Sequence, residues 1–403
     1  MLRLAIALTL LLLFASYFPS GCDTLNGGGG DGARINSVET SEAIVTAQAA
    51  EVTVAAVRDL GVIRINDIIQ KRDCGLSVEF AGRSVWLFGD TLLATPNEDN
   101  RTFLSNSWSS TYDTDAGDGI DGFTERVDAV GAPQEFFPLT EAERALADEY
   151  EGEVCEEGPC TAHWDMWPGT IIVDQEKGWA YVFYRKVYCE RGLFNFHHVG
   201  HSIAVWKNVE DSPERPEFDY VDDYPTLFFA EDGEAGFGSA AVLVDKLAYV
   251  YGCELGEDEL TKPCHLARVP LADILDKSAW RFYAGEGQWQ TDSRGSQAIF
   301  TGNDMMSVFF NAHLNRYVAV YSEPLAATAM LRTAVRPEGP WSAPVELFSV
   351  DAPENVYGWV YDFLAHPEFS QDNGRIIYIT YTKKIDRMHS QLRQVAVELD
   401  PPR

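Results

Sequence analysis

Residues 82–91 read Gly82-Arg83-Ser84-Val85-Trp86-Leu87-Phe88-Gly89-Asp90-Thr91, and this stretch carries the strongest fold signal in the chain. Apolar and aromatic residues alternate along it with the period of two that is typical of a β-strand packed on a core. The strand then stops at an acidic side chain, Asp90. Catalytic groups often lie at such strand ends because the scaffold holds their rotamers. A turn-capping role is the alternative interpretation of Asp90.

The same strand pattern recurs four more times along the chain. Each later strand carries an aromatic residue at the place of Phe88, and these residues are Tyr184, Tyr251, Tyr321 and Tyr381. The intervals are of the size that a four-stranded propeller blade needs, roughly 40 to 60 residues or more with long loops. We therefore predict an all-β fold, a five-bladed β-propeller. The alternative is that aromatic strands look alike in any all-β protein.

A hairpin is predicted around the short turn Ala81-Gly82. Residues 72–80 form a second alternating run before this turn, which is a hairpin signal. The first blade is expected to begin near Val62. Asp73 precedes one strand of the hairpin and Asp90 follows the other, so an antiparallel pairing would place both carboxylates at the same end, facing one site.

The N-terminus reads as an export signal. Residues 1–21 hold one positive charge and a long apolar run, which predicts a signal peptide. Ser20-Gly21-Cys22 resembles a bacterial lipobox, in which the cysteine is lipidated, and residues 22–36 form a glycine-rich tether after it. An ordinary signal peptide cleaved near Ala15 is the alternative. We expect an exported protein, lipid-anchored to a bacterial membrane through Cys22 and facing the periplasm or cell surface.

The rest of the chain is predicted to form one domain. Residues 37–403 are long for a single domain, but all-β rings often reach this size. A long acidic insertion at about 113–160, in the first or second blade, accounts for the large first interval. No second apolar span follows the signal peptide, so contact with a membrane is expected only through the lipid anchor.

The charge of the chain restricts its partners. The formal net charge is −31, which disfavours nucleic acid and anionic lipid head groups. A neutral glycan would not be repelled. We therefore expect a polysaccharide or other glycan as partner, no nucleic acid, and a monomer.

The cysteines favour an oxidising compartment. Of the 7 cysteines in the chain, six remain after lipidation of Cys22, an even number that suits disulfides. Six cysteines allow many connectivities. The preferred pairing uses two local pairs and leaves one distant pair: Cys155–Cys160, Cys253–Cys264 and Cys74–Cys189.

The sequence predicts no metal site and no cofactor. Cys155 and Cys160 with nearby His163 match no zinc spacing. The dense run His197-His198-x2-His201 is expected in a solvated hairpin loop. The sequence contains no phosphate loop, dinucleotide fingerprint or Gly-x-Ser-x-Gly elbow. A structural calcium ion held by acidic side chains near the propeller axis stays open as an alternative.

Polar and aromatic residues precede or open the inner strands of the predicted blades. Such residues build carbohydrate pockets, because sugars stack on aromatic rings and hydrogen-bond to carboxylates and amides. Glu323 holds in blade four the place that Asp90 holds in blade one. The predicted substrate-binding residues are Asp165, His163, Asn106, Glu323, Trp359 and Tyr361. A core position is the alternative for the two aromatic residues.

Several segments resemble one family. Asp73-Cys74-Gly75-x-Ser77-Val78, followed by Trp86-Leu87-Phe88-Gly89-Asp90-Thr91, is similar to the opening hairpin of the secreted bacterial domain-of-unknown-function family numbered 4185. Later segments resemble the same family in order, over roughly residues 60 to 395: Tyr249-Val250-Tyr251-Gly252, Arg332-Thr333-Ala334, Gly339-Pro340-Trp341-Ser342 and Ala365-His366-Pro367-Glu368. The resemblance implies a five-bladed propeller. Some relatives are D-arabinan hydrolases of glycoside hydrolase family 183, and their acidic pair would correspond to Asp73 and Asp90.

Two classes of function follow. Glycoside hydrolysis needs two carboxyl groups that flank the scissile bond, and two carboxyl groups in one pocket raise each other's pKa. We predict an extracytoplasmic glycoside hydrolase for a furanose-containing, D-arabinan-like polysaccharide, with Asp73 and Asp90 as catalytic pair. The alternative is a non-catalytic surface lipoprotein whose propeller binds a glycan or a protein.

Overall fold

The computed structural model of the protein describes residues 52–64, 66–148, 162–190, 195–256, 261–324, 326–352, 359–386 and 389–400. The predicted signal peptide, the tether with Cys22, and the predicted Cys155–Cys160 pair lie outside these residues. In the described part of the chain, no helix is long and apolar enough to cross a bilayer.

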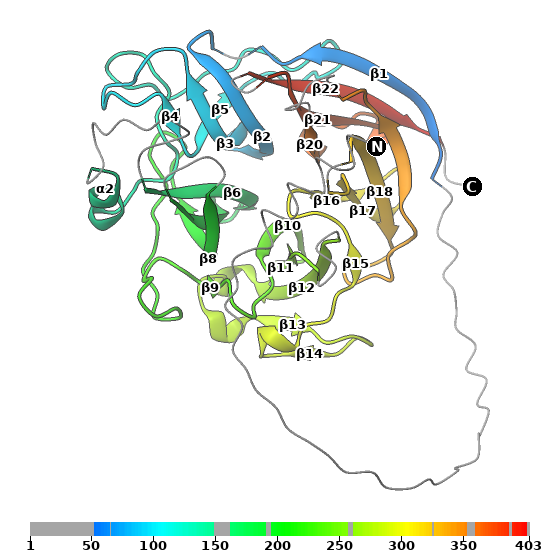
Figure 1. Ribbon diagram of the computed structural model, residues 1–403. Helices are drawn as coiled ribbons and strands as arrows, with labels where there is room; N and C mark the ends of the chain where they lie inside the picture. Colours follow the sequence, from blue (N-terminus) through cyan, green and yellow to red (C-terminus); the bar gives the residue numbers. More distant parts are fainter. Residues whose placement is uncertain are drawn as a thin grey trace, which may run out of the picture. The chain divides into compact units, whose positions relative to one another are not determined.

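Five antiparallel sheets follow one another around a ring, which confirms the predicted all-β propeller (Figure 1). Blade one contains β2 (Ile69–Phe80), β3 (Arg83–Leu93), β4 (Phe103–Leu104) and β5 (Ser107–Thr111). Blade two contains β6 (His163–Asp174), β7 (Trp179–Cys189), β8 (Phe196–Trp206) and β9 (Phe229–Ala230). Blade three contains β10 (Phe237–Val244), β11 (Leu247–Cys253), β12 (Pro263–Pro270), β13 (Arg281–Tyr283), β14 (Trp289–Gln290) and β15 (Phe300–Thr301).

The remaining two blades have four strands each. Blade four contains β16 (Ser307–Asn311), β17 (Arg316–Tyr321), β18 (Thr328–Ala334) and β19 (Val345–Ser349). Blade five contains β20 (Val360–Ala365), β21 (Ile376–Lys384), β22 (Ser390–Leu399) and β1 (Val54–Val62). The helical segments are α2 (Glu141–Asp148) and the 3-10 turns Leu271–Asp273, Lys277–Ala279, Ser293–Gly295, Pro367–Phe369 and Asp372–Gly374.

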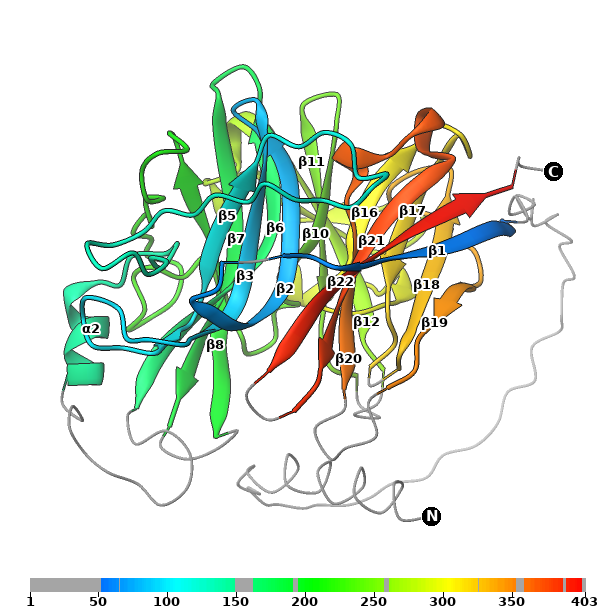
Figure 2. The same ribbon diagram turned by 90° about the horizontal axis from the view of Figure 1, so that it is seen from above.

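A strand from the start of the described chain closes the last blade. β1 runs antiparallel to β22, with Val54 opposite Leu399 and Val62 opposite Arg393, and the two strands lie side by side in Figure 2. The expectation that blade one begins near Val62 is therefore wrong. Val62 ends the outermost strand of blade five, and blade one begins at Ile69. This pairing joins the two ends of the ring.

The predicted hairpin forms at the expected turn. Phe80 lies opposite Arg83, and both residues between them have positive φ, 53° at Ala81 and 75° at Gly82. Two central residues with positive φ define the hairpin turn whose twist matches that of the flanking strands. The local sequence therefore fixes the register of β2 against β3.

Five large hydrophobic clusters fill the interfaces between neighbouring blades. Each cluster draws side chains from two adjacent sheets, for example Leu87 and Val182, Phe183 and Val250, Tyr251 and Tyr321, Val320 and Ile379, and Trp86 and Tyr378. The five aromatic residues that mark the predicted repeat are all buried in these clusters. Both faces of each sheet are thus covered, which explains why the repeated strands are apolar on both sides.

The inner strands of the ring pack closely against one another. β6 and β10 come so near that a Cβ on Gly169 would lie 2.5 Å from the carbonyl oxygen of Gly238. Only glycine permits that approach. Irregular register also marks four inner strands, near Cys74 on β2, after Pro168 on β6, after Phe237 on β10 and after Tyr361 on β20. Such bulges re-aim the side chains next to them.

Helix α2 is attached to blade two through one buried glutamate. Thr140 and Glu143 form a capping box, in which each side chain accepts a hydrogen bond from the other's backbone N–H. Glu143 also pairs with Lys186 and Arg215, each at 2.6 Å. Burial alone would raise the pKa of Glu143, but these two cations hold it at about 2. The segment before β6 is thereby tied to the sheet that follows it.

One predicted disulfide is confirmed and one is wrong. Cys253 and Cys264, direct partners on β11 and β12, are bonded. Cys74 and Cys189 are instead free and buried. Their sulfurs have different surroundings, because Cys74 lies 3.9 Å from the Met305 sulfur whereas Cys189 donates to Asp165 at 3.1 Å. The Cys74–Cys189 pairing followed only from the two local pairs having been assigned first, and no positional evidence supported it.

The prediction that the histidine-rich segment lies in a solvated loop is also wrong. His197, His198 and His201 lie on β8, not in a loop, and His201 is buried. Arg185 on the neighbouring strand donates to His201 Nε2 at 2.8 Å. Burial and this guanidinium lower the pKa of His201 to about 3, so its imidazole is neutral.

The ring closure can be tested by cavity formation at its last strand. Leu399 is fully buried opposite Val54, so Leu399→Ala should lower the free energy of unfolding by about 2 to 5 kcal/mol. Val57→Ala on the partner strand removes an exposed side chain and should change it by less than about 0.5 kcal/mol. Urea unfolding followed by fluorescence measures both. Equal effects of the two substitutions would contradict this closure.

Candidate active site

Charged side chains from all five blades meet where the inner strands begin or bend. They come from β2 and β3, from β6 and β7, from the residue before β12, from the loop before β16, and from β20. The group consists of Lys71, Asp73, Asp90, Asp165, Arg185, Lys262, Asp304 and Asp362. The ring geometry thus gathers residues that are far apart in sequence.

The hairpin of blade one brings Asp73 and Asp90 to the same level, as predicted. Arg72 lies opposite Thr91 and Cys74 opposite Phe88, so these register pairs bracket both aspartates. The bulge at Cys74, which has φ 74°, turns the chain next to Asp73. Lys71 Nζ lies 3.1 Å from Asp73 Oδ2. An opposite charge at this distance favours the ionised form of a carboxyl group.

The pKa of Asp90 is raised to near neutral pH. Burial raises its pKa to about 7, the negative charge of Asp165 adds to the rise, and Lys71 opposes it. The residue keeps some exposed surface, whereas its Oδ1 atom is buried. A substrate can therefore reach a carboxyl group that is protonated in a substantial fraction of molecules at neutral pH. Such pKa values are typical of catalytic acids.

A second carboxyl group with a raised pKa was missed by the sequence analysis. Burial raises the pKa of Asp362 to about 8, with further contributions from Asp73 and Asp304. Asp362 lies in the β20 bulge with φ 55°, a conformation that few residues other than glycine adopt. In the sequence, only its position directly after Tyr361 indicated that Asp362 lies in the site, and Tyr361 was predicted as a site residue in its place.

Asp304 has the opposite electrostatic environment. Lys262 Nζ and Arg185 Nη1 lie 2.5 and 3.1 Å from its two oxygens. Burial alone would raise the pKa of Asp304, but these cations hold it well below its usual range. Asp304 is therefore a permanent carboxylate that links blades two, three and four.

Three carboxylate oxygens at this place make no hydrogen bond within the described part of the chain, although His163 Nε2 lies 3.3 Å from one of them, Asp165 Oδ1. They are Oδ1 of Asp73, Oδ1 of Asp90 and Oδ1 of Asp165, all buried. Buried polar atoms normally have partners, and exceptions cluster where a ligand or a reaction supplies one. The arrangement leaves three acceptors for the hydroxyl groups of a bound molecule or for a cation.

The predicted substrate-binding residues fall into two groups. Asp165, His163 and Tyr361 lie in the site, since His163 contacts Asp165 at 3.3 Å, and burial together with the nearby charge of Asp73 raises the pKa of the Tyr361 hydroxyl. Trp359 precedes β20, with Lys384 Nζ 5.1 Å from its ring centroid.

Asn106 and Glu323 have different surroundings. Asn106 is buried, and its oxygen accepts hydrogen bonds from the backbone N–H groups of Phe136 and Phe137. It thereby anchors a loop. Glu323 is exposed after β17 and takes no part in the ion pairs that the described residues form. Their roles in substrate binding stay predictions.

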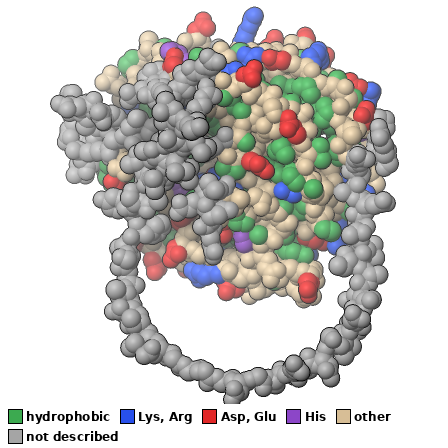
Figure 3. All heavy atoms as spheres, turned by 45° about the vertical axis from the view of Figure 1, so that its right-hand side comes forward, with side chains coloured by type: hydrophobic (Ala, Val, Ile, Leu, Met, Phe, Trp, Pro, Cys, Tyr) green, Lys and Arg blue, Asp and Glu red, His purple; other side chains and the backbone are tan. Residues whose placement is uncertain are grey.

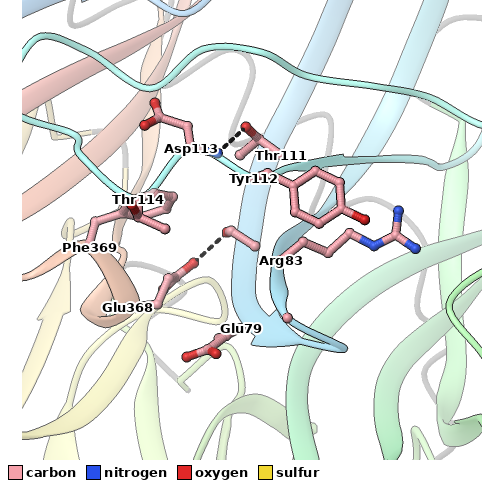
Figure 4. A pocket seen from close by; sticks show the side chains of 10 residues that line it. Glu79, Arg83, Thr111, Tyr112, Asp113, Thr114, Glu368 and Phe369 are labelled. Carbon is pink, nitrogen blue, oxygen red and sulfur yellow. Dashed lines mark hydrogen bonds between the residues drawn. The ribbon is translucent and has the colours of Figure 1, made fainter.

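A separate cavity of about 140 Å³ opens at the other end of blade one (Figure 4). It is lined by the Gly82 turn, by Tyr112 and by Glu368, which accepts a hydrogen bond from Ser84 at 2.9 Å. Because the turn is at the opposite end of the hairpin from Asp73 and Asp90, this cavity is distinct from the candidate active site.

The surface charge is dispersed over the face that can be seen. Figure 3 shows acidic, basic and hydrophobic side chains interspersed, without one dominant acidic area. The net charge of −31 is therefore not concentrated at one binding patch on this face.

Comparisons with solved structures give distant similarities. A protein of unknown function from Dyadobacter fermentans is 11% identical with a TM-score of 0.45, covering 86% of this chain and 100% of that chain. The family 117 glycoside hydrolase Zg3597 from Zobellia galactanivorans is 10% identical with a TM-score of 0.44, covering 85% and 90%. The catalytic domain of a GH62 α-L-arabinofuranosidase from Coprinopsis cinerea is 9% identical with a TM-score of 0.45, covering 87% and 97%. Likenesses this distant establish no activity for this chain.

The sequence comparisons identify the family. None of the curated proteins matches the sequence significantly. The family model described as "Domain of unknown function (DUF4185)" matches residues 68–386, which span the hairpin with Asp73 and Asp90, and Asp304 and Asp362. The chain therefore belongs to the DUF4185 family.

Proposed function

We propose that this protein is a glycoside hydrolase that acts on a furanose-containing, D-arabinan-like polysaccharide. The observation that carries the proposal is the pair Asp73 and Asp90. One hairpin brings them together, Asp73 faces Lys71 at 3.1 Å, and burial with the charge of Asp165 raises the pKa of Asp90 to about 7. Glycosidic cleavage requires two carboxyl groups at one site, one of which can act as a proton donor near neutral pH.

The proposed roles follow from these environments. Protonated Asp90 donates its proton to the leaving-group oxygen as the glycosidic bond breaks. Ionised Asp73 either takes a proton from the attacking water or attacks the anomeric carbon directly, and the separation of the carboxyl groups decides between inversion and retention. Tyr361 lies near Asp73, whose charge adds to the effect of burial in raising the pKa of the Tyr361 hydroxyl, and its proposed role is to orient that carboxylate. Asp362 is the competing candidate for the proton donor, because its pKa is also raised.

The substrate class rests on charge and on family resemblance. A chain of net charge −31 suits a neutral glycan better than an anionic one. Tyr361 offers aromatic surface beside Asp73 and Asp362, as sugar sites commonly do. The furanose preference comes from the resemblance of the opening hairpin to D-arabinan hydrolases of glycoside hydrolase family 183.

Substitution of the proposed pair is the first test. Asp73→Asn and Asp90→Asn should each lower the release of reducing sugar from arabinan or arabinogalactan, on the order of 10²- to 10⁴-fold, because each removes one proton-transfer group. Asp219→Asn, which changes an exposed aspartate, is the matched control and should keep wild-type activity. If the folded wild-type protein cleaves no furanoside in such a panel, the non-catalytic glycan- or protein-binding alternative replaces the proposal.

The pH dependence identifies the acid. If Asp90 donates the proton, kcat/KM should fall as the pH rises through about 7, because the protonated form is then lost. Asp165→Asn removes a negative neighbour and should move this limb to lower pH, whereas Lys71→Met should move it to higher pH. A limb near pH 8 that does not move in Asp165→Asn, with activity abolished in Asp362→Asn, would instead assign the acid to Asp362.

We further propose that the protein is exported and lipid-anchored through Cys22, and that it acts as a monomer. In a bacterial host fed a labelled fatty acid, the wild-type chain should take up label and Cys22→Ala should not. Cys74→Ser, which changes a buried cysteine on β2, should label as the wild type does. Persistent labelling of Cys22→Ala would contradict the lipid anchor.

A further inference from the structure

A cluster of imidazole, carboxylate and thiol lies beside the candidate catalytic pair. His163 and Asp165 are two residues apart on β6, so their side chains leave the same face of the sheet. Cys189, at the end of β7, is the direct cross-strand partner of His163. The Cβ atoms of such partners lie roughly 4.5 to 5.5 Å apart. Two paired strands therefore hold the three side chains together rigidly.

The distances between their ligand atoms are close to those of a metal site. Asp165 Oδ1 lies 3.3 Å from His163 Nε2, and Asp165 Oδ2 lies 3.1 Å from Cys189 Sγ. One ligand atom of each residue lies within 4.8 Å of the other two. Zinc ligands at roughly 2.0 to 2.3 Å from the ion are about 3.3 to 3.8 Å apart in a tetrahedral shell. A small contraction would thus place all three on one ion.

The surroundings favour a cation. Asp165 is 3% exposed, and the partners nearest its two oxygens are the other two residues of the cluster, His163 at Oδ1 and Cys189 at Oδ2. A buried carboxylate whose neighbours are an imidazole and a weak thiol donor is costly, and a metal ion lowers that cost. Asp90 and Glu135 are close enough for their charges to interact with that of Asp165. The His163 side chain is 19% exposed and provides the side from which an ion enters.

We propose that His163, Asp165 and Cys189 bind one Zn²⁺ ion. On binding, the Cys189 thiol loses its proton to solvent and its sulfur donates an electron pair to the ion, as do His163 Nε2 and an Asp165 oxygen; no group is oxidised or reduced. A thiolate and an imidazole select Zn²⁺ over Ca²⁺ and Mg²⁺, which take oxygen ligands. Three protein ligands leave a fourth position for water or a substrate oxygen. The prediction that the chain holds no metal site is replaced by this proposal.

Metal titration of the purified full chain tests the proposal without any activity assay. Competition with a chromophoric chelator should give one tightly bound Zn²⁺ per chain. Co²⁺ in its place should show a sulfur-to-cobalt charge-transfer band, which reports the thiolate. Cys189→Ser should abolish the band, and Cys189→Ser and His163→Gln should each weaken Zn²⁺ binding by at least about 100-fold.

Matched controls separate this site from the other cysteines. Cys74→Ser changes the second buried free cysteine and should keep both the stoichiometry and the cobalt band. Cys155→Ser/Cys160→Ser should do the same. Near-ultraviolet circular dichroism of the metal-free variants checks that they are folded, and Asp165→Asn supplies an independent ligand substitution if Cys189→Ser does not fold. Absence of stoichiometric Zn²⁺ in the wild type, or a cobalt band that survives Cys189→Ser, would overturn the proposal. A wild-type protein that binds Zn²⁺ but cleaves no glycan would contradict only the proposed glycoside hydrolase activity and would leave the zinc site supported.

Discussion

The antiparallel pairing of β1 with β22 is the constraint on which the ring depends. It joins residues more than three hundred positions apart, as in the hydrogen bond from Thr53 to Asp400. Without this pairing, blade five would present β22 as an open edge and the interface between blades five and one would lose its geometric support. The clusters around Trp86 and Tyr378 fill that interface. Because the five large hydrophobic clusters each lie between neighbouring blades, the convergence of the inner strands requires the whole ring.

The cluster of charged residues in the candidate active site is a consequence of that convergence. Asp304 is neutralised by Lys262 and Arg185, and Asp73 is paired with Lys71. Asp90 and Asp362 have no such dedicated cation, and burial raises their pKa values to about 7 and about 8. The supply of cations therefore separates Asp304, whose pKa Lys262 and Arg185 hold well below its usual range, from Asp90 and Asp362, which titrate near neutral pH. That division is an electrostatic property of the assembled ring and of no single blade.

Local chemistry made part of this structure predictable. The Ala81-Gly82 turn and the alternation around it specify the hairpin, so the placement of Asp73 beside Asp90 followed from sequence alone. The aromatic residue in the second strand of each blade gave the blade number, because it must be buried between sheets. β1 could not be assigned, since its partner lies at the other end of the chain. Asp362 was missed because a bulge and the ring closure, not a local pattern, bring it to the site.

Backbone strain and buried charge occur at the same places. Cys74, next to Asp73, and Asp362 both have positive φ, a conformation that costs a non-glycine residue on the order of 1 to 3 kcal/mol. Both positions also lie in bulges that interrupt otherwise regular inner strands. A chain selected for stability alone would place glycine or regular strand at both positions and would pair Asp90 and Asp362 with cations. Strained backbone and buried charge thus coincide at one end of the ring, where three carboxylate oxygens also make no hydrogen bond to any described residue. This coincidence marks that end as the part of the fold shaped by chemistry.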